Sequence, residues 1–454
     1  MTNKFDQADP LSIESYAKKL KGSSLRKYVN TDSVKEPGGG RGSFGLILEK
    51  YYFGIEQNSR PEPDFKEAGL EVKSSPLKKL GSGKLVAKER LVMNMITYGD
   101  VVKENFENSS FLYKNHLLLL IFYLYEKGVN VLDYVVQLAR MWKFPEEDIK
   151  IIKDDWTKIV EKIKAGKAHE LSEGDTLYLG ACTKSSNSSV RTPQPFSSEP
   201  AKPRAFSLKQ NYLNGIVQNL LEEAEPIVKN ISEYKEALTF EDIVRKRFEP
   251  FIGMTSEDIS KKLNLGINQS SKNYFATLAR RIMGVQKQKV LEFEKAGVEM
   301  KVVQIKKSGM PKEDMSFPKF NYMELSKEKW EDIDENGEVV DCEFKQQLQK
   351  RFFFVVFECA DTCKKEEDRI LKKVLFWTMP VKDIEGEVKR VWEETVKKIN
   401  NGNADELPKK SESSVAHVRP HARDASDTEE TPENGMLVKK CFWLNKEYIE
   451  RQIR

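Results

Sequence analysis

One charged segment occurs twice in this chain. Residues 64–81 (DFKEAGLEVKSSPLKKLG) and 292–309 (EFEKAGVEMKVVQIKKSG) align without a gap. The aligned pairs of identical residues are Phe65/Phe293, Ala68/Ala296, Gly69/Gly297, Glu71/Glu299, Lys73/Lys301, Lys78/Lys306, Lys79/Lys307 and Gly81/Gly309. A repeat of this kind predicts that the chain folds as two related units, because each copy needs the same local packing.

Three further pairs of segments follow the same order. At offsets of about 230 residues, the matches are 48–54 with 278–284, 156–171 with 392–407, and 206–212 with 442–448. A chain of 454 residues is also long for a single hydrophobic core. The polar connection 220–238 is the natural boundary, so the sequence predicts two domains, residues 1–225 and 226–454.

The hydrophobic periodicity of the first copy mixes helices and strands. Helical patterns cover 11–20, 43–53, 146–165 and 206–222, and strand patterns cover 70–75, 89–98, 117–125 and 176–183. This combination predicts the α/β (α+β) class, with a mixed sheet flanked by helices. The Ser/Pro-rich stretch 185–204 predicts a mobile loop, and 409–435 is its counterpart in the second copy.

Composition excludes several classes of protein. The longest apolar run, 117–125, is about half the ~20 residues of a membrane span, and the N-terminus has no apolar signal region. Five scattered cysteines favour a reduced, cytoplasmic location over a disulfide framework. With 75 basic and 71 acidic residues, the net charge does not by itself favour nucleic acid as a partner.

The repeated strand carries residues that could bind a metal. Glu71 and Lys73 are two apart, so they share a strand face, and Asp64 follows a proline seven positions before Glu71. Two converging carboxylates repel each other unless a cation joins them, and hard oxygen ligands select Mg²⁺. The alternative is an exposed, ion-paired strand face, which is common for a lone Glu-x-Lys pair.

The spacing P-D-x6-E-x-K resembles the signature of the PD-(D/E)xK nucleases. The segments 42–54, 68–80, 114–123, 170–189 and 204–212 resemble the MutH mismatch-repair endonucleases and, more closely, the GATC-cutting type II restriction endonucleases related to them. With the repeat included, the resemblance covers almost the whole chain. It implies a restriction-endonuclease-like fold, duplicated in two tandem domains.

The resemblance also implies roles for individual residues. Asp64 and Glu71 would be metal ligands, Lys73 the catalytic lysine, Glu49 an additional acid, and Lys114 a further lysine of the active site. For Lys114, a lysine at the start of a strand that faces water is an open alternative.

Further positions would contact DNA. Lys184 would contact a base, since lysine donates to guanine O6 and N7 in the major groove. Ser207 and Lys209 fall where the family contacts DNA, and Lys209 would bind phosphate. In the second copy, Arg419 and Arg423 are candidate contacts, with a solvated basic loop as the alternative.

The sequence therefore predicts a Mg²⁺-dependent restriction endonuclease that cleaves double-stranded DNA at GATC. In the second copy Glu292 replaces Asp64 and Ala279 replaces Glu49, which should spoil a metal site. The resemblance implies that such a copy binds a second site without cutting. The enzyme would be a monomer that dimerises on DNA, and its host would need a cognate methyltransferase. A methyl-directed repair nickase and a catalytically dead DNA-binding regulator are the alternatives.

Overall fold

The computed structural model describes residues 4–30, 34, 42–56, 61–80, 83–185, 189–218, 223–234, 239–266, 271, 273–333, 339–359, 368–433 and 435–454. It divides the chain into two compact units. The N-terminal unit comprises Met1–Glu223 with two short later segments, Glu294–Gly297 and Ile333–Val339, and the C-terminal unit comprises the rest. The main division falls beside the boundary predicted at residues 225 and 226.

The N-terminal unit alternates helices and strands, as its periodicity predicts. Its helices are α1 (Pro10–Lys18), α2 (Gly42–Ile47), α3 (Tyr98–Val101), α4 (Ser110–Asn115), α5 (Glu146–Lys164) and α6 (Gln210–Gln218). Its strands are β1 (Glu71–Lys79), β2 (Leu85–Ala87), β3 (Leu91–Ile96), β4 (Leu118–Leu124), β5 (Val136–Trp142), β6 (Leu179–Thr183), β7 (Thr192–Gln194), β8 (Ser197–Ala201) and β9 (Arg204–Leu208).

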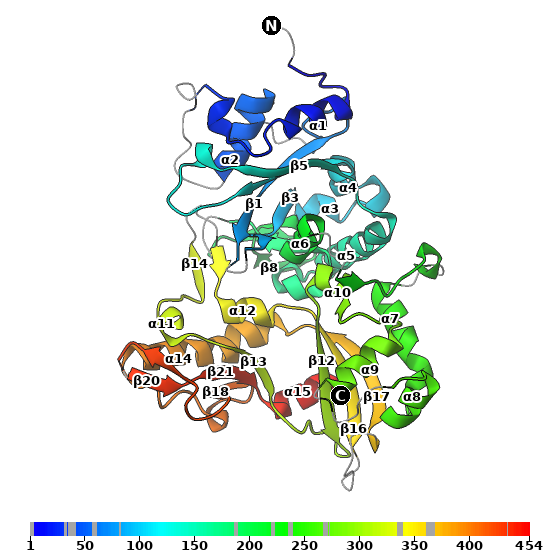
Figure 1. The fold of residues 1–454 in the computed structure, drawn as a ribbon, viewed down its shortest axis with the longest axis vertical. Coiled ribbons are helices and arrows are strands. Elements are labelled where there is room, and N and C mark those ends of the chain that lie inside the picture. Colours follow the sequence, from blue (N-terminus) through cyan, green and yellow to red (C-terminus); the bar gives the residue numbers. More distant parts are fainter. Residues whose placement is uncertain are drawn as a thin grey trace. The chain divides into compact units, whose positions relative to one another are not determined.

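Two sheets organise this unit. The first has the order β2-β1-β4-β5, in which β1 and β4 run parallel and Glu71 lies opposite Leu118. Strand β4 is buried on both faces, which explains its unbroken apolar sequence. The second sheet has the order β3-β9-β6. Helices α1 and α2 pack against β5 and β1 of the first sheet (Figure 1).

The C-terminal unit repeats this plan. Its helices are α7 (Phe240–Phe248), α8 (Ser256–Lys262), α9 (Tyr274–Ile282), α10 (Leu291–Ala296), α11 (Tyr322–Leu325), α12 (Glu343–Leu348), α13 (Val381–Asp383), α14 (Lys389–Asn400) and α15 (Lys446–Ile453). Its strands are β10 (Ala224–Glu225), β11 (Lys289–Val290), β12 (Glu299–Lys306), β13 (Met315–Lys319), β14 (Glu331–Ile333), β15 (Val339–Asp341), β16 (Phe352–Cys359), β17 (Ile370–Trp377), β18 (Ala416–Pro420), β19 (Thr428–Thr431), β20 (Gly435–Val438) and β21 (Lys440–Leu444).

Matching registers show that the two units share one architecture. Strands β12, β16 and β17 correspond to β1, β4 and β5, again with a parallel first pair, and Glu299 lies opposite Phe352 as Glu71 lies opposite Leu118. The second sheet, β13-β21-β18, corresponds to β3-β9-β6. The mixed sheets flanked by helices and the duplication therefore confirm the predicted fold class.

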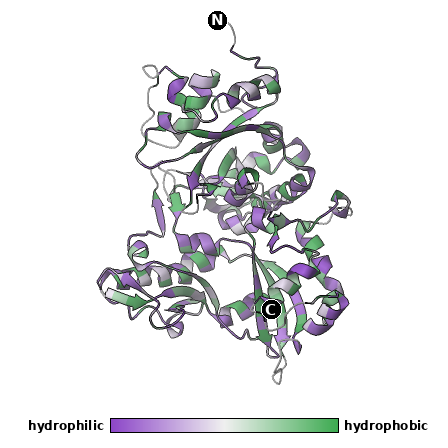
Figure 2. Cartoon of the chain, in the orientation of Figure 1, coloured by the Kyte–Doolittle hydropathy of each residue, from purple (hydrophilic) through white to green (hydrophobic). Residues whose placement is uncertain are grey.

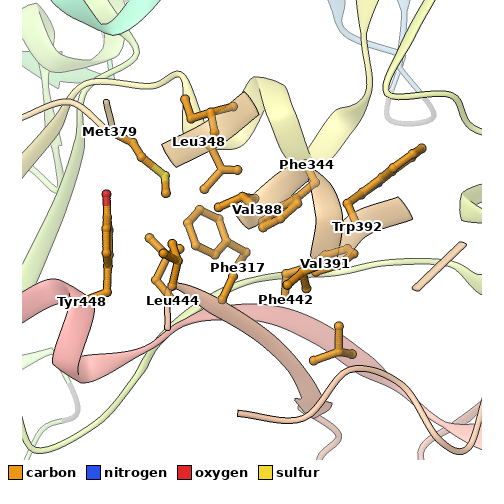
Figure 3. Packing of buried hydrophobic residues seen from close by; sticks show 14 of the residues in the cluster. Phe317, Phe344, Leu348, Met379, Val388, Val391, Trp392, Phe442, Leu444 and Tyr448 are labelled. Carbon is orange, nitrogen blue, oxygen red and sulfur yellow. The ribbon is translucent and has the colours of Figure 1, made fainter. Parts of the chain in front are cut away.

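Buried apolar side chains from both sheets of the C-terminal unit and from its helices form one core cluster. Phe442 and Leu444 of β21 point into this core toward Phe317 and Phe344 (Figure 3). Along many helices of both units, hydrophobic and hydrophilic residues alternate (Figure 2). Among the helices that the structure describes, none has the length and apolar character needed to cross a bilayer.

Two stretches differ from the predictions. Residues 206–222 are not one helix, because the apolar residues of β9 end at Leu208 and α6 begins only at Gln210; residues 219–222 lie outside the described part. The stretch 185–204 contains a hairpin of β7 and β8 rather than only a loop, and its residues 186–188 lie outside the described part. Strand β5 was not predicted, although its partner β4 was.

Candidate active site

The turn before β1 brings an acid beside the charged strand. Phe65 and Leu70 pair across a tight turn, and this pairing returns Asp64 to the start of β1. The Asp64 backbone N–H donates to Glu71 Oε2 at 3.1 Å, and Asp64 Oδ2 accepts from the Val72 N–H at 2.9 Å. Glu71 is only 1% exposed. The two carboxyl groups are thus held together by the backbone of the turn.

Two lysines converge on the same carboxylate oxygen. Lys73 Nζ lies 2.8 Å and Lys114 Nζ lies 3.4 Å from Glu71 Oε1. Lys114 comes from the last turn of α4, and its side chain is 16% exposed. The alternative of a water-facing lysine at the start of a strand is therefore wrong.

Glu49 completes the group from a π-helical turn, Leu48–Phe53, that continues α2. Such turns are frequent at functional sites. Burial, followed by the charge of Asp64, raises the pKa of Glu49 to about 7. Burial and the charge of Glu71 raise the pKa of Asp64 to about 6. The charges of Lys73 and Lys114 act on both acids in the opposite direction, so the five residues form one electrostatic group.

This donor set fits a hard divalent cation. Within the described part of the chain, no group of three or more His, Cys, Asp or Glu side chains is already arranged around a metal position. However, Mg²⁺ commonly takes one or two carboxylates and completes its shell with waters and substrate phosphate. Asp64 and Glu71 supply those carboxylates. Burial first, and neighbouring acids second, raise the pKa values of Asp64 and Glu49, so a bound cation would stabilise their ionised forms.

In the corresponding site of the C-terminal unit, Glu299 also contacts two lysines, as Glu71 does. Glu299 Oε1 lies 2.7 Å from Lys301 Nζ, and Glu299 Oε2 lies 3.6 Å from Lys350 Nζ. Burial alone would raise the pKa of Glu299, but these two lysines lower it below its ordinary value. Glu292, the counterpart of Asp64, accepts backbone N–H groups of Ile227 and Val228 at 3.0 Å.

Two predicted DNA contacts are buried. The Lys209 side chain donates to the carbonyl oxygens of Glu173 and Thr176 at 2.6 and 2.5 Å, and Lys209 is 6% exposed. Ser207 is 0% exposed on β9. Neither side chain presents its polar group at the surface in this structure, so a DNA contact by either residue stays a prediction. Lys184, by contrast, follows β6 and is half-buried.

The two arginines predicted to contact DNA, Arg419 and Arg423, are both at the surface. Arg419 lies on β18 with its side chain 43% exposed, and its Nη1 is 3.3 Å from Asp314 Oδ2. Arg423 is 82% exposed, and its Nε is 3.0 Å from Asp424 Oδ2. Asp314 was not predicted as part of any site, because nothing in its local sequence, PKEDM, shows that this acid becomes buried.

Comparisons with known proteins agree with this organisation. A family model for the DNA mismatch repair enzyme MutH matches the chain twice, over residues 53–155 and 284–386. The first match contains Asp64, Glu71 and Lys73, and the second contains Glu299 and Lys301. The double match confirms the predicted duplication.

Individual relatives fall into two groups. The chain is 35% identical to the type II restriction enzyme Sau3AI of Staphylococcus aureus, over 97% of this chain and 98% of that enzyme. It is 28% identical to the DNA mismatch repair protein MutH of Shewanella woodyi, over 39% of this chain and 76% of that protein. The MutH protein of Shigella flexneri is 24% identical over 44% of this chain and 88% of its own length.

Proposed function

This chain belongs to the type II restriction enzymes that are built on a duplicated MutH-like domain, and from that premise we propose a Mg²⁺-dependent endonuclease that cuts double-stranded DNA at GATC. Such enzymes are site-specific deoxyribonucleases, and restriction and MutH nucleases generally depend on divalent metals. We further propose that the N-terminal unit cuts and that the C-terminal unit binds a second site.

The electrostatics of the N-terminal site carry this proposal. Three acids, Glu49, Asp64 and Glu71, lie in one buried group, and the pKa of two of them is raised. Burial, the larger cause, and repulsion between the acids both disfavour the ionised carboxylates unless a cation neutralises them. A divalent cation held here would act at the phosphate that is attacked.

The residues of the site divide the work. Asp64 and Glu71 would hold Mg²⁺, which would polarise the phosphodiester and lower the pKa of a bound water. Lys73, anchored by Glu71, would orient or deprotonate that water, or donate to the developing charge on the phosphate. Lys114 adds positive charge beside the same carboxylate. Glu49 would be the additional acid of the site.

Specificity and assembly complete the proposal. Lys184 at the end of β6 would donate to guanine O6 and N7 of GATC. The GATC sequence has two-fold symmetry, and each chain would have one cutting unit. Two chains would therefore assemble on DNA to cut both strands. A restriction enzyme of this kind would work in the cytoplasm, beside a methyltransferase that protects the host's own GATC sites.

Plasmid digestion with Mg²⁺, followed by sequencing of the ends, tests the proposal. We expect ends only at GATC, no cutting in excess EDTA, and cutting restored by adding Mg²⁺ back. Plasmids prepared with and without adenine or cytosine methylation define the protected form. Random ends, or cutting that survives EDTA, would contradict the proposal.

A repair nickase is the second candidate, and the MutH relatives that match part of the chain favour it. The two candidates differ in product. A restriction enzyme converts supercoiled plasmid to linear DNA in one binding event or two successive cuts, whereas a nickase accumulates the open circular form. The near full-length match to a restriction enzyme supports the first.

A further inference from the structure

The second sheet of each unit can be compared strand by strand. Leu208 of β9 lies opposite Leu179, and Leu444 of β21 lies opposite Ala416. These two leucines are also aligned in the sequence repeat. Following the register from them, Arg419 takes the position of Cys182, because each lies opposite the third residue before its leucine.

The same register identifies three other replacements. Trp443 takes the position of Ser207, and His417 that of Gly180. Continuing along the strand, His421 takes the position of Lys184. The C-terminal unit has thus replaced small side chains on one sheet face by an arginine, an indole and an imidazole.

This face is opposite the apolar core. Phe442 and Leu444 point into the core from one face of β21 (Figure 3), so Trp443 between them lies on the other face. The Arg419 guanidinium carbon lies 3.8 Å from the centre of the Trp443 ring. The His421 ring stacks on the same indole with centroids 5.1 Å apart. Parts of this face are buried in both units, Cys182 and Ser207 in one and His417 and Cys441 in the other, but the Arg419 side chain is 43% exposed.

The Arg419 guanidinium also contacts a buried acid, Asp314. Asp314, directly before β13, is 9% exposed and contacts Arg419 Nη1 at 3.3 Å. Its Oδ1 accepts from Lys410 Nζ at 2.6 Å and from the Lys446 N–H at 2.7 Å. Asp314 therefore contacts Arg419, Lys410 and Lys446. The Arg419 guanidinium lies between the Asp314 carboxylate and the Trp443 ring.

The N-terminal unit has an ion pair of reversed polarity at the same place. Arg90, directly before β3, pairs with Glu173 at 2.8 Å, whereas Asp314, directly before β13, pairs with Lys410. Glu173 and Lys410 each begin a 3-10 turn six residues before β6 or β18. In both pairs the acid is the more buried partner. The basic side chain, Arg90 or Lys410, is therefore the more exposed one at this end of the sheet.

A guanidinium held in this way is suited to reading a base. A flat, preorganised fork presents paired N–H groups, and guanine is the base with two acceptors, O6 and N7, in the major groove. Arg423 differs, because its side chain is 82% exposed and its guanidinium pairs with its sequence neighbour Asp424 at 3.0 Å rather than with a buried acid and a ring. Such a mobile arginine suits a phosphate, which carries no sequence information.

We propose that Arg419 reads guanine in the second DNA site bound by the C-terminal unit, with Trp443 and Asp314 as its positioning residues. This inference deepens the second-site binding proposed above and rests on it. Arg419 performs there the task that Lys184 performs in the N-terminal unit, from a position two residues earlier along the strand.

The test uses the full-length protein and a plasmid with a single GATC site. Cleavage is stimulated by a short GATC duplex that contains either guanine or 7-deazaguanine, which lacks the N7 acceptor. For the unchanged protein, we expect half-maximal stimulation to need a roughly ten-fold higher concentration of the 7-deazaguanine duplex. Arg419→Lys keeps the charge and a single donor but loses the planar fork, so it reduces the difference between the two duplexes several-fold.

Two further variants test the positioning and the specificity. Trp443→Ala has the same effect as Arg419→Lys, because the guanidinium loses its platform; a purely structural role would leave the sensitivity to N7 intact. Arg423→Lys is the matched control and keeps the full difference between the duplexes.

Each remaining outcome overturns a defined statement. If the unchanged protein is not stimulated by either duplex, the second-site function and this inference both fail. If stimulation occurs and Arg419→Lys keeps the full difference between the duplexes, only the inference fails. If Arg419→Lys weakens GATC and scrambled duplexes equally, Arg419 is a phosphate contact and the base assignment is wrong.

Discussion

At the scale of single residues, the candidate site contains acids whose ionised forms are disfavoured by burial and by the neighbouring acids. Glu49 and Asp64 have pKa values raised to about 7 and about 6 because both are buried near other acids. A bound divalent cation requires the deprotonated forms. The two carboxyl groups therefore couple metal binding to pH in the range where the enzyme would work.

The first prediction concerns metal affinity. We expect the affinity for Mg²⁺ to rise as the pH increases from about 6 to about 8, since protons compete with the metal below the raised pKa values. Isothermal titration in buffers of different ionisation enthalpy should also show proton release. Glu49→Gln should reduce this release. An affinity that is constant across the range would contradict the account.

The second prediction concerns stability without metal. Because the folded pKa of Glu49 is raised, its contribution to stability is present below the unfolded value of 4.5 and is lost as the pH rises through about 7. Glu49→Gln should therefore raise the melting temperature by a few degrees at pH 8 and leave it nearly unchanged at pH 4.5. Calorimetry in EDTA measures both. Equal shifts at the two pH values would contradict the prediction.

The third prediction concerns a buried cation of the C-terminal unit. Lys345 is 3% exposed, and its Nζ lies within 2.9 Å of Glu331, Asp341 and Glu385. Lys345→Met leaves these acids without their shared partner and should destabilise the unit by about 3–5 kcal/mol. The control Lys329→Met removes an exposed ion pair with Asp332 and should change little. Denaturant unfolding compares the two variants.

At the scale of elements, the repeat shows which residues the fold itself requires. Gly166 and Gly402 are aligned in the matched segments 156–171 and 392–407, and both have positive φ, +71° and +72°. A side chain on Gly166 would meet the Phe196 carbonyl oxygen at 2.6 Å, and one on Gly402 would meet Glu433 at 3.3 Å. In both units, therefore, the hairpin that follows β6 or β18 packs closely against this glycine.

The fourth prediction follows from these contacts. Gly166→Ala should destabilise the protein more than Gly128→Ala, because both positions have positive φ but Gly128 has no neighbour within 4 Å. The backbone strain alone costs about 1–2 kcal/mol, and the clash at Gly166 adds to it. Thermal unfolding of both variants gives the comparison. Equal destabilisation would mean that the hairpin moves aside freely.

The sequence predicted the elements that have a strong local signal. The apolar run of β4 and the alternation of β1 are local patterns, and the turn that returns Asp64 to Glu71 follows from the recognised motif. The burial of Lys209 was not predictable, because its partners Glu173 and Thr176 lie more than thirty residues earlier. The same reason applies to the position of Asp314 beneath Arg419.

At the scale of the whole molecule, duplication allows two units to diverge around one architecture. Glu71 and its counterpart Glu299 each contact two lysines, but among the described residues only the N-terminal unit places two further acids, Glu49 and Asp64, with raised pKa values in the same group of charges. The second sheet differs in another way. The C-terminal unit stacks Arg419 on Trp443 where the N-terminal unit has Cys182 and Ser207. These differences support the proposal that the N-terminal unit cuts and the C-terminal unit binds a second DNA site.

The fifth prediction concerns assembly. One cutting unit per chain predicts that two chains assemble on a GATC duplex when Ca²⁺ replaces Mg²⁺ to prevent cutting. Sedimentation should show the free protein as a monomer and the bound protein at twice that mass. A complex with one chain, together with linear product from single binding events, would contradict this assembly.

The most direct measurement compares the same substitution at equivalent positions of the two copies. Lys73→Ala should reduce plasmid cleavage by roughly 10²–10⁴-fold, because Lys73 acts at the reacting phosphate, whereas Lys301→Ala should retain cleavage. The melting temperatures of both variants verify that each is folded. Equal losses in the two variants, or full activity of folded Lys73→Ala, would contradict the claim that the N-terminal copy alone holds the catalytic centre.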